Sequence, residues 1–248
     1  MLLCRLRSFS YMIEGGVTCR ACWNMQLTAR RTFLSKTKEE KQAAKEKRKQ
    51  ERKELVGEIT KGYFSDLKEL KQSGGKRFFA KDKLITEKDA LVFPEFQAKN
   101  LRNRVINLRT EFPGSTTLVL MWLRAYGQIM CSKYKENFTK EFADHPDVKY
   151  FEVNVVEGWF YRLLKPFIEK SLRSQIPVKN QGNYLCYFGN TEPLKKGLVE
   201  NVIVGYAFLV DSQGRVRWKA HGTPTQEELQ YMTDCTNMLI KDVQKRKT

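Results

Sequence analysis

The segment Thr116–Trp122, which reads TTLVLMW, constrains the fold more than any other part of this chain. It is far shorter than the roughly 20 apolar residues that span a bilayer, so it is expected to be a buried β-strand. Residues 127–143 follow it with apolar side chains at helical i, i+4 spacing. This stripe consists of Ile129, Met130, Tyr134, Phe138 and Phe142. A buried strand that runs into an amphipathic helix predicts an α/β domain in which helices pack on a sheet.

Further strands and one long helix are predicted downstream. The strands are expected over Val148–Val156, Tyr184–Phe188, Val202–Val210 and Arg215–Ala220, with a hairpin turn at Asp211–Gly214. For the last helix, Thr223 is the predicted N-cap, because Pro224 suits the first helical position and Gln226 stands three residues after the cap. Within the aromatic-rich segment 159–172, Pro166 predicts a kink or an early stop.

The junction between the strand and the helix resembles that of thioredoxin-type proteins, in which Cys-x-x-Cys opens the helix. A thiol there is activated by the amide groups and dipole of the first helical turn, and disulfide exchange needs a second cysteine within reach. In this chain Tyr126 stands at the position of the nucleophile and Ile129 at that of the resolving cysteine. Neither side chain can perform the exchange reaction.

Cys131 is the cysteine nearest to this junction, and it lies about one turn deeper in the predicted helix. A peroxidatic cysteine would need a proline where Arg124 stands and a threonine or serine where Gln128 stands. A packing role for the Cys131 thiol is therefore favoured. A mitochondrial thiol oxidoreductase or peroxidase that uses Cys131 remains the alternative.

A second position supports the loss of redox chemistry. Redox thioredoxin folds place a cis-proline opposite the thiol, just before a buried strand, and here Gly205 occupies that place. A cis bond before a residue other than proline costs about 3 kcal/mol, so the substrate-gripping geometry is expected to be absent. The segment Phe93–Leu101 resembles the opening of the peroxiredoxin branch. The expected fold is therefore an α/β, thioredoxin-like sandwich of the peroxiredoxin-type branch over residues 84–244, with the redox motif lost.

The first 83 residues divide into two parts. Residues 1–35 contain five arginines, no lysine and one acidic residue, which is typical of a mitochondrial transit peptide that would be cleaved near Phe33 or Leu34. The Cys19/Cys22 pair is expected to leave with this leader. Residues 36–83 predict a charged helical extension, whose first part lacks large apolar residues and whose second part, near 55–70, has helical apolar spacing.

The chain carries a formal net charge of +17, which suits nucleic acid, anionic lipid or an acidic protein as a partner. Fixed-register aromatic motifs for nucleic acid are missing, so no nucleic acid is expected, although a mitoribosome- or RNA-associated protein remains a second alternative. The two histidines, His145 and His221, lack a nucleophile or ligand spacing, and no phosphate-binding glycine loop is present. No catalytic residue, metal or cofactor is predicted.

Three segments together resemble the mitochondrial ATPase complex subunit ten family of F-type ATP synthase assembly factors. They are TTLVLMWLRAYGQIMCSKY, FEVNVVEGWFYRLLKPFIEKSLR and NVIVGYAFLVDSQGRVRWKAHGTPTQEEL, within residues 84–240. The resemblance implies a non-catalytic chaperone at the matrix side of the inner membrane, peripherally attached. It implies that the client is newly made membrane-sector subunit a, and that the chaperone promotes the joining of this subunit to the rotor ring.

A candidate binding surface follows from these segments. The helix N-terminus can accept an anion or a peptide carbonyl, and the aromatic segment flanked by basic residues suits a membrane interface or a hydrophobic client helix, although core packing explains it equally well. The candidate residues are Arg124, Tyr126, Gly127, Gln128, Trp159, Phe160, Arg162, Gly205, Tyr206, Arg217 and Trp218.

Overall fold

A computed structural model of the chain describes residues 42–50, 76, 78–158, 161 and 163–247. It divides into two compact units, Met1–Glu58 and Ile59–Thr248. In the first unit, residues 42–50 form a helix whose residues are all exposed, as expected for a charged helix with no face to bury. The predicted transit peptide, the Cys19/Cys22 pair and the amphipathic helix near 55–70 lie outside the described residues.

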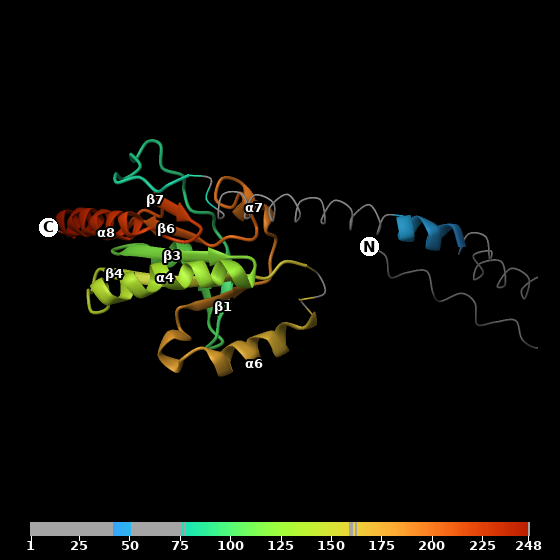
Figure 1. Cartoon of the computed structure of the whole chain (residues 1–248). Coiled ribbons are helices and arrows are strands. Elements are labelled where there is room, and N and C mark those ends of the chain that lie inside the picture. The colour runs from blue at the N-terminus through green and yellow to red at the C-terminus, as the bar shows by residue number, and fades with distance from the viewer. Residues whose placement is uncertain (1–41, 51–75, 77, 159–160, 162, 248) are drawn as a thin grey trace, which may run out of the picture. The chain divides into compact units, whose positions relative to one another are not determined.

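The second unit is built on one mixed sheet with the strand order β2-β1-β5-β4-β3-β6-β7 (Figure 1). The strands are β1 Gln97–Asn100, β2 Val105–Asn107, β3 Thr116–Trp122, β4 Val148–Val155, β5 Tyr184–Tyr187, β6 Tyr206–Val210 and β7 Val216–His221. Strands β3, β4 and β5 are parallel, while the β1–β2 and β6–β7 hairpins are antiparallel. A parallel β-α-β unit, a terminal hairpin and a final helix confirm the predicted thioredoxin-like fold.

Two long helices cover one face of this sheet. The helices are α3 Leu108–Glu111, α4 Ala125–Phe142, α6 Lys165–Gln175, α7 Glu192–Lys195 and α8 Gln226–Lys247, with a 3₁₀ turn at Val178–Asn180. Helices α4 and α8 contact each other and β3, and bury Tyr134, Phe138 and Leu239 against Trp122. The predicted α4 stripe is therefore confirmed except at Ile129, which is 60% exposed.

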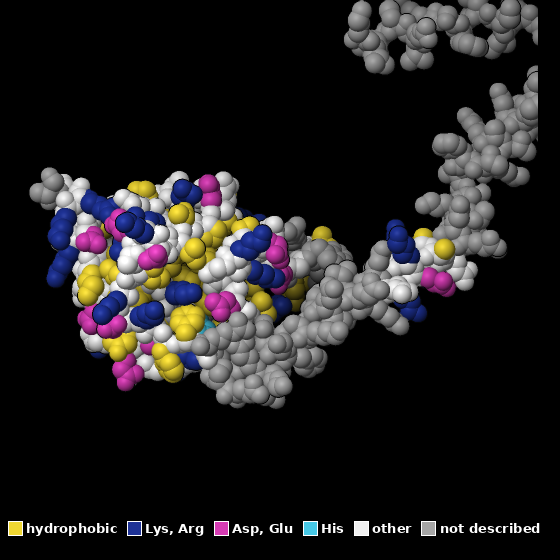
Figure 2. All heavy atoms as spheres, turned by 90° about the horizontal axis from the view of Figure 1, so that it is seen from above, with side chains coloured by type: hydrophobic (Ala, Val, Ile, Leu, Met, Phe, Trp, Pro, Cys, Tyr) yellow, Lys and Arg dark blue, Asp and Glu magenta, His cyan; other side chains and the backbone are white. Residues whose placement is uncertain are grey.

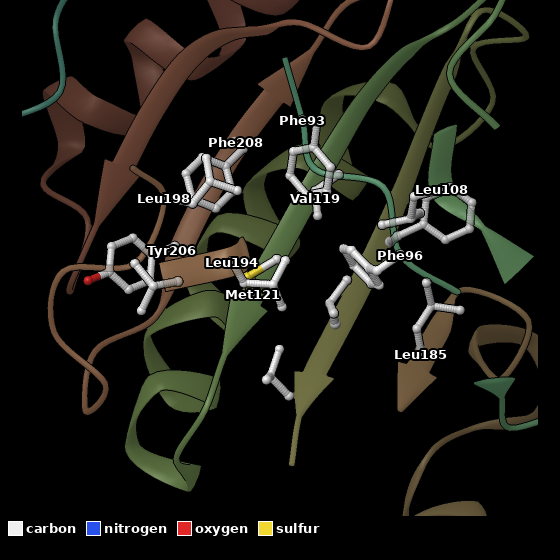
Figure 3. Packing of buried hydrophobic residues seen from close by; sticks show 14 of the residues in the cluster. Phe93, Phe96, Leu108, Val119, Met121, Leu185, Leu194, Leu198, Tyr206 and Phe208 are labelled. Carbon is white, nitrogen blue, oxygen red and sulfur yellow. The ribbon is translucent and has the colours of Figure 1, made fainter. Parts of the chain in front are cut away.

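The opposite face of the sheet is covered by the segment that precedes β1 and by α3 and α7. Figure 3 shows Phe93 over Val119 and to one side of Phe208, with Leu198 beside Phe208. Leu194 belongs to the same cluster. The Phe93 ring meets those of Phe112 and Phe208 edge-on, at centroid distances of 5.6 and 6.1 Å. Both faces of β3 are thus fully buried, as its uninterrupted apolar sequence predicts.

One predicted strand boundary is wrong for an identifiable reason. Strand β6 begins at Tyr206, because Val202–Gly205 forms an irregular approach to the sheet. The predicted interruption near Pro166 agrees with the structure: Tyr161 and Leu163 are helical, the chain turns at Leu164, and α6 begins at Lys165. Pro166 stands in the first turn of α6, where its missing N–H costs nothing.

The N-cap of α8 is Thr225, not Thr223. The Thr225 hydroxyl accepts a hydrogen bond from the Glu228 N–H (3.2 Å), and the Glu228 carboxylate accepts one from the Thr225 N–H (3.0 Å). This reciprocal pair is a capping box. The sequence offers two threonines two residues apart, and the one followed three residues later by a carboxylate forms the cap.

Lys76 and residues 78–92, here together called the strap, lie along the β7 edge of the domain. The carboxylate of Glu228 is buried, accepts a hydrogen bond from the Ala80 N–H (2.9 Å) and pairs with Lys76. Val92 forms an isolated bridge with Arg215. Residues before 84, which the sequence assigns to the extension, therefore contact the thioredoxin-like domain.

Candidate functional site

The junction between β3 and α4 is the position at which a thioredoxin-type enzyme would carry its thiols. Helix α4 begins after Arg124, whose extended backbone forms the N-cap without a side-chain hydrogen bond. Tyr126 and Ile129, in place of the two cysteines, are 48% and 60% exposed. The helix therefore presents apolar surface where reactive sulfur would stand.

Gly127 and Gly205 close the space behind this junction. A Cβ atom on Gly205 would lie 2.2 Å from the Gly127 carbonyl oxygen and 2.6 Å from the Cys131 Sγ. A Cβ atom on Gly127 would lie 2.9 Å from the Gly205 nitrogen. The two backbones are in contact, so neither a proline nor any side chain fits in the groove where a substrate thiol would be held. The described residues contain no cis peptide bond.

The Cys131 thiol lies under this contact and is buried. Its Sγ is 3.5 Å from the Tyr206 carbonyl oxygen and 3.7 Å from that of Met121. Burial raises the pKa of Cys131 far above its usual range, and the nearby charge of Glu152 adds to the shift. Since the thiolate is the nucleophile, a thiol held protonated in the core cannot begin exchange or peroxide chemistry.

The other two cysteines of the described residues are also buried and free. Burial raises the pKa of Cys186 to about 12 and that of Cys235 to about 11. Cys186 lies on β5 and Cys235 on α8. The three thiols are thus packing groups on three different elements, and no His, Cys, Asp or Glu cluster of metal-binding size occurs in the described part of the chain.

Five of the predicted surface residues are buried: Gly127, Gly205, Tyr206, Arg217 and Trp218. The Tyr206 hydroxyl accepts hydrogen bonds from the Glu200 and Asn201 N–H groups (2.9 and 2.7 Å) and donates to the Asn201 carbonyl (3.1 Å). Figure 3 shows this hydroxyl at the margin of the apolar cluster. Tyr206 therefore fixes the loop that leads into Gly205.

Arg217 and Trp218 attach the strap to β7. The Arg217 Nε donates to the Ile85 carbonyl (2.7 Å), and the Trp218 Nε1 donates to the Lys81 carbonyl (2.9 Å). Arg217 also pairs with Asp211 at 3.4 Å. These side chains are engaged within the domain and are not presented to a partner.

Arg124, Tyr126 and Gln128 are the remaining described members of the predicted surface, and all three are at least partly exposed. Trp159, Phe160 and Arg162 lie outside the described residues.

Arg124 contributes to the positive electrostatic field around Glu157, which follows the end of β4. Burial opposes ionisation of Glu157, but hydrogen bonds from Lys195 and Thr191 and the charges of Lys195 and Arg124 outweigh it and lower its pKa.

Exposed apolar side chains occur in the segments that follow β3 and β4, and both segments leave the sheet at the same edge because the two strands are parallel. These side chains, here together called the apolar edge, are Tyr126, Ile129, Tyr161, Leu163 and Phe167. Leu163 is 67% exposed and Phe167 is 72% exposed. Their sequence signal was the aromatic-rich composition of 159–172, but composition did not distinguish exposed from buried side chains.

Polar contacts fix the rest of α6 to the domain, and Phe167 remains exposed to solvent. Glu169 is buried and pairs with Lys99 (3.3 Å) and Arg173 (3.2 Å), and the Arg173 Nε donates to the Leu101 carbonyl (2.7 Å). These contacts fix which face of α6 points to the sheet. Exposed large apolar side chains beside fixed cations are typical of an interaction surface.

Positive charge is not confined to this edge. Figure 2 shows lysine and arginine side chains spread over one face of the domain among acidic and apolar ones. No helix of the described residues has the length and apolar character needed to cross a membrane.

The chain is similar to proteins of one family along most of its length. A model of the family described as ATP10 protein matches residues 20–239. The probable mitochondrial ATPase complex subunit atp10 of Schizosaccharomyces pombe is 29% identical over 193 residues, which cover 77% of this chain and 70% of the relative. The mitochondrial ATPase complex subunit ATP10 of Saccharomyces cerevisiae is 26% identical over 208 residues, which cover 71% and 70%.

Solved structures with a similar arrangement include two thiol-disulfide proteins. A thiol:disulfide interchange protein of the thioredoxin family from Chlorobium tepidum has a TM-score of 0.41 and 13% identity, covering 61% of this chain and 97% of that chain. A secreted thiol-disulfide isomerase from Corynebacterium glutamicum has a TM-score of 0.44 and 16% identity, covering 64% and 90%. The match over residues 20–239 identifies the family, and this chain belongs to the ATP10 protein family.

Proposed function

We propose that this protein is a non-catalytic assembly factor of the mitochondrial F-type ATP synthase. Membership of the ATP10 family and relatives named as mitochondrial ATPase complex subunits support the assembly role. The observation that carries the non-catalytic part is the backbone contact between Gly127 and Gly205, which fills the substrate groove above a buried Cys131 thiol. A scaffold without a reaction site acts by binding.

The client in this proposal is newly made membrane-sector subunit a, held at the matrix face of the inner membrane until it joins the rotor ring. The apolar edge supports a hydrophobic client, since Leu163 and Phe167 are mostly exposed while α6 itself is firmly docked. Burying two such side chains against a client helix would contribute about 1.5–3 kcal/mol each. The net positive charge supports peripheral attachment to anionic lipid.

Cells that lack the protein test the proposal. Native gels of their mitochondria should show depleted ATP synthase, and crosslinking during mitochondrial protein synthesis should capture subunit a with the reintroduced wild-type chain. Normal synthase assembly in the deletion would reject the assembly role. If the reintroduced wild-type chain restores full assembly but forms no crosslink to subunit a, subunit a is not its client.

A paired substitution tests the apolar edge within that experiment. Leu163→Glu with Phe167→Glu should abolish rescue and the crosslink, because two carboxylates cannot enter an apolar contact. Met238→Glu is the matched control, since Met238 is 46% exposed on α8, outside the apolar edge. Rescue by the double variant at normal abundance would show that this edge does not hold the client.

A further inference from the structure

Strand β4 is longer than its neighbour β5. Residues Glu152–Val155 pair with β5, whereas β3 pairs along β4 from Val148 onwards. Residues Val148–Phe151 therefore have no strand partner on the β5 side within the described part of the chain. The Glu152 N–H points to this side and donates to the Asn183 carbonyl (2.9 Å). Because backbone groups alternate along a strand, the N–H and C=O of Tyr150 face the same side.

The unpaired half of β4 lines a cavity of about 680 Å³. We call this cavity the β4 notch. Its apolar wall comes from Phe138 and Phe142 of α4 on one face of the sheet and from Ile106 on the other. Its far wall is the turn between β1 and β2, which carries Arg102 and Arg104. The notch is thus an opening in the plane of the sheet, with side chains on both faces.

Hydrogen bonds hold the far wall of the notch in place. The Asn100 amide donates to the Gly182 carbonyl (3.0 Å), and its side-chain oxygen accepts from the Arg102 and Arg104 N–H groups (3.1 and 2.8 Å). The Leu101 N–H donates to the Gln181 carbonyl (3.2 Å). The chain that leads into β5 is therefore tied to β1 and does not pair with the first half of β4.

Cations surround the notch. They are Arg102, Arg104, Lys149 and Lys179, against the single carboxylate of Glu111. Lys149 pairs with Glu111 at 3.5 Å, and Arg102 donates to the Val178 carbonyl. Arg104 and Lys179 have no acidic partner among the described residues. This field disfavours the chain's own lysine- and arginine-rich segment 36–54 as an occupant and favours a partner that carries carboxylates.

We propose that the β4 notch binds an extended acidic segment of a partner protein by strand addition to β4. About four residues, at roughly 3.3 Å each, would pair with Val148–Phe151. Backbone hydrogen bonds to Tyr150 supply the pairing, one row of side chains meets Phe138 and Phe142, and carboxylates meet Arg104 and Lys179. The Val148 N–H, on the same side, already donates to the His145 carbonyl (3.1 Å). The N–H and C=O of Tyr150 and the C=O of Val148 fit a peptide main chain, whereas a phosphate headgroup offers no matching donors. This site is separate from the apolar edge and goes beyond the proposed function.

The test uses the full chain and a fluorescein-labelled peptide of alternating valine and glutamate, followed by fluorescence anisotropy. Saturable binding is expected, and Arg104→Glu with Lys179→Glu should weaken it at least about tenfold. Lys241→Glu makes the same kind of charge change at an exposed residue of α8 and should leave binding unchanged. Methylating alternate peptide nitrogens should abolish binding in at least one of the two possible registers, because strand pairing needs those N–H groups.

Three results would overturn the proposal. The first is no peptide binding, or equal binding by the charge-reversed and wild-type chains. The second is unchanged binding of the peptides methylated in both registers. The third is that the wild-type chain binds cardiolipin-containing vesicles but not the peptide, and that the charge reversal abolishes the vesicle binding. That result would assign the cations to lipid. Thermal unfolding checks the fold, and Arg104→Ala with Lys179→Ala replaces the reversal if the reversed chain is unfolded.

Discussion

The carbonyl oxygen of Gly127 lies where a side chain on Gly205 would begin, so the first turn of α4 and the start of β6 are in backbone contact. Replacing Gly205 with alanine should destabilise the domain by about 3 kcal/mol, since the neighbouring atoms belong to backbone and to a buried thiol. Urea unfolding would measure the change.

The matched control is Gly182→Ala, where the nearest atoms are 3.7 Å away in the Arg102 side chain. That substitution should change the free energy of unfolding by no more than about 0.5 kcal/mol. Equal effects of the two substitutions would show that the contact between Gly127 and Gly205 does not restrict the site.

We expect Glu228 to hold the strap to the last helix. Its carboxylate accepts hydrogen bonds from the Ala80 and Thr225 N–H groups and pairs with Lys76. Glu228→Ala should therefore lower the free energy of unfolding by about 3 kcal/mol. Trypsin should then cut faster after Lys81 and Lys83 of the strap.

The neighbouring substitution Glu227→Ala is the control, because Glu227 is exposed in the same helical turn. It should cost less than about 1 kcal/mol, through the helix dipole alone. If both variants resist trypsin like the wild type, Glu228 does not hold the strap.

We expect the three buried thiols to be chemically unreactive in the folded chain. The chain with Cys131, Cys186 and Cys235 all replaced by alanine should still restore synthase assembly in cells that lack the protein, because all three are packing groups. In the native chain, alkylation of Cys235 should stay slow near neutral pH and accelerate only towards its pKa of about 11. Urea should make the thiols react quickly.

The thiol oxidoreductase or peroxidase alternative would return on one of two results. One is rapid stoichiometric alkylation of Cys131 in the native chain. The other is a variant that is present at normal abundance but does not restore assembly.

We expect Glu157 to make the free energy of unfolding depend on pH. Its pKa lies below the ordinary 4.5 in the folded chain, so the ionised form stabilises the fold. The contribution is complete above the unfolded pKa and disappears as the pH falls through the folded pKa. Glu157→Gln should therefore be less stable than the wild type at pH 7, and the difference should shrink in acid. A difference that stays constant with pH would exclude this linkage.

The sequence predicted the strands and helices whose pattern is local. TTLVLMW is apolar on both faces and is buried on both faces, and the α4 spacing matches the side that meets Trp122. Ile129 was misplaced because it does not share the i, i+4 spacing of Met130, Tyr134, Phe138 and Phe142 and lies on the opposite side of α4. The apolar character of a residue next to a stripe does not place it on the buried face.

Contacts between distant segments explain the other differences. Trp218 and Arg217 are residue types that are common at interfaces, but here the strap covers them. Their side-chain N–H groups donate hydrogen bonds to strap carbonyl groups. The sequence predicted that β5 is shorter than β4, but not that β5 pairs only with Glu152–Val155, and the β4 notch depends on this register. Such features depend on pairing between segments far apart in the chain.

The ring closed by the Ala80–Glu228 hydrogen bond spans 148 residues. The bonds from Trp218 to Lys81 and from Arg217 to Ile85 span 137 and 132 residues. Until α8 has formed, this closure cannot be completed and the strap stays without its partners. High contact order of this kind slows folding, so the strap is expected to dock among the last steps in the folding of the domain.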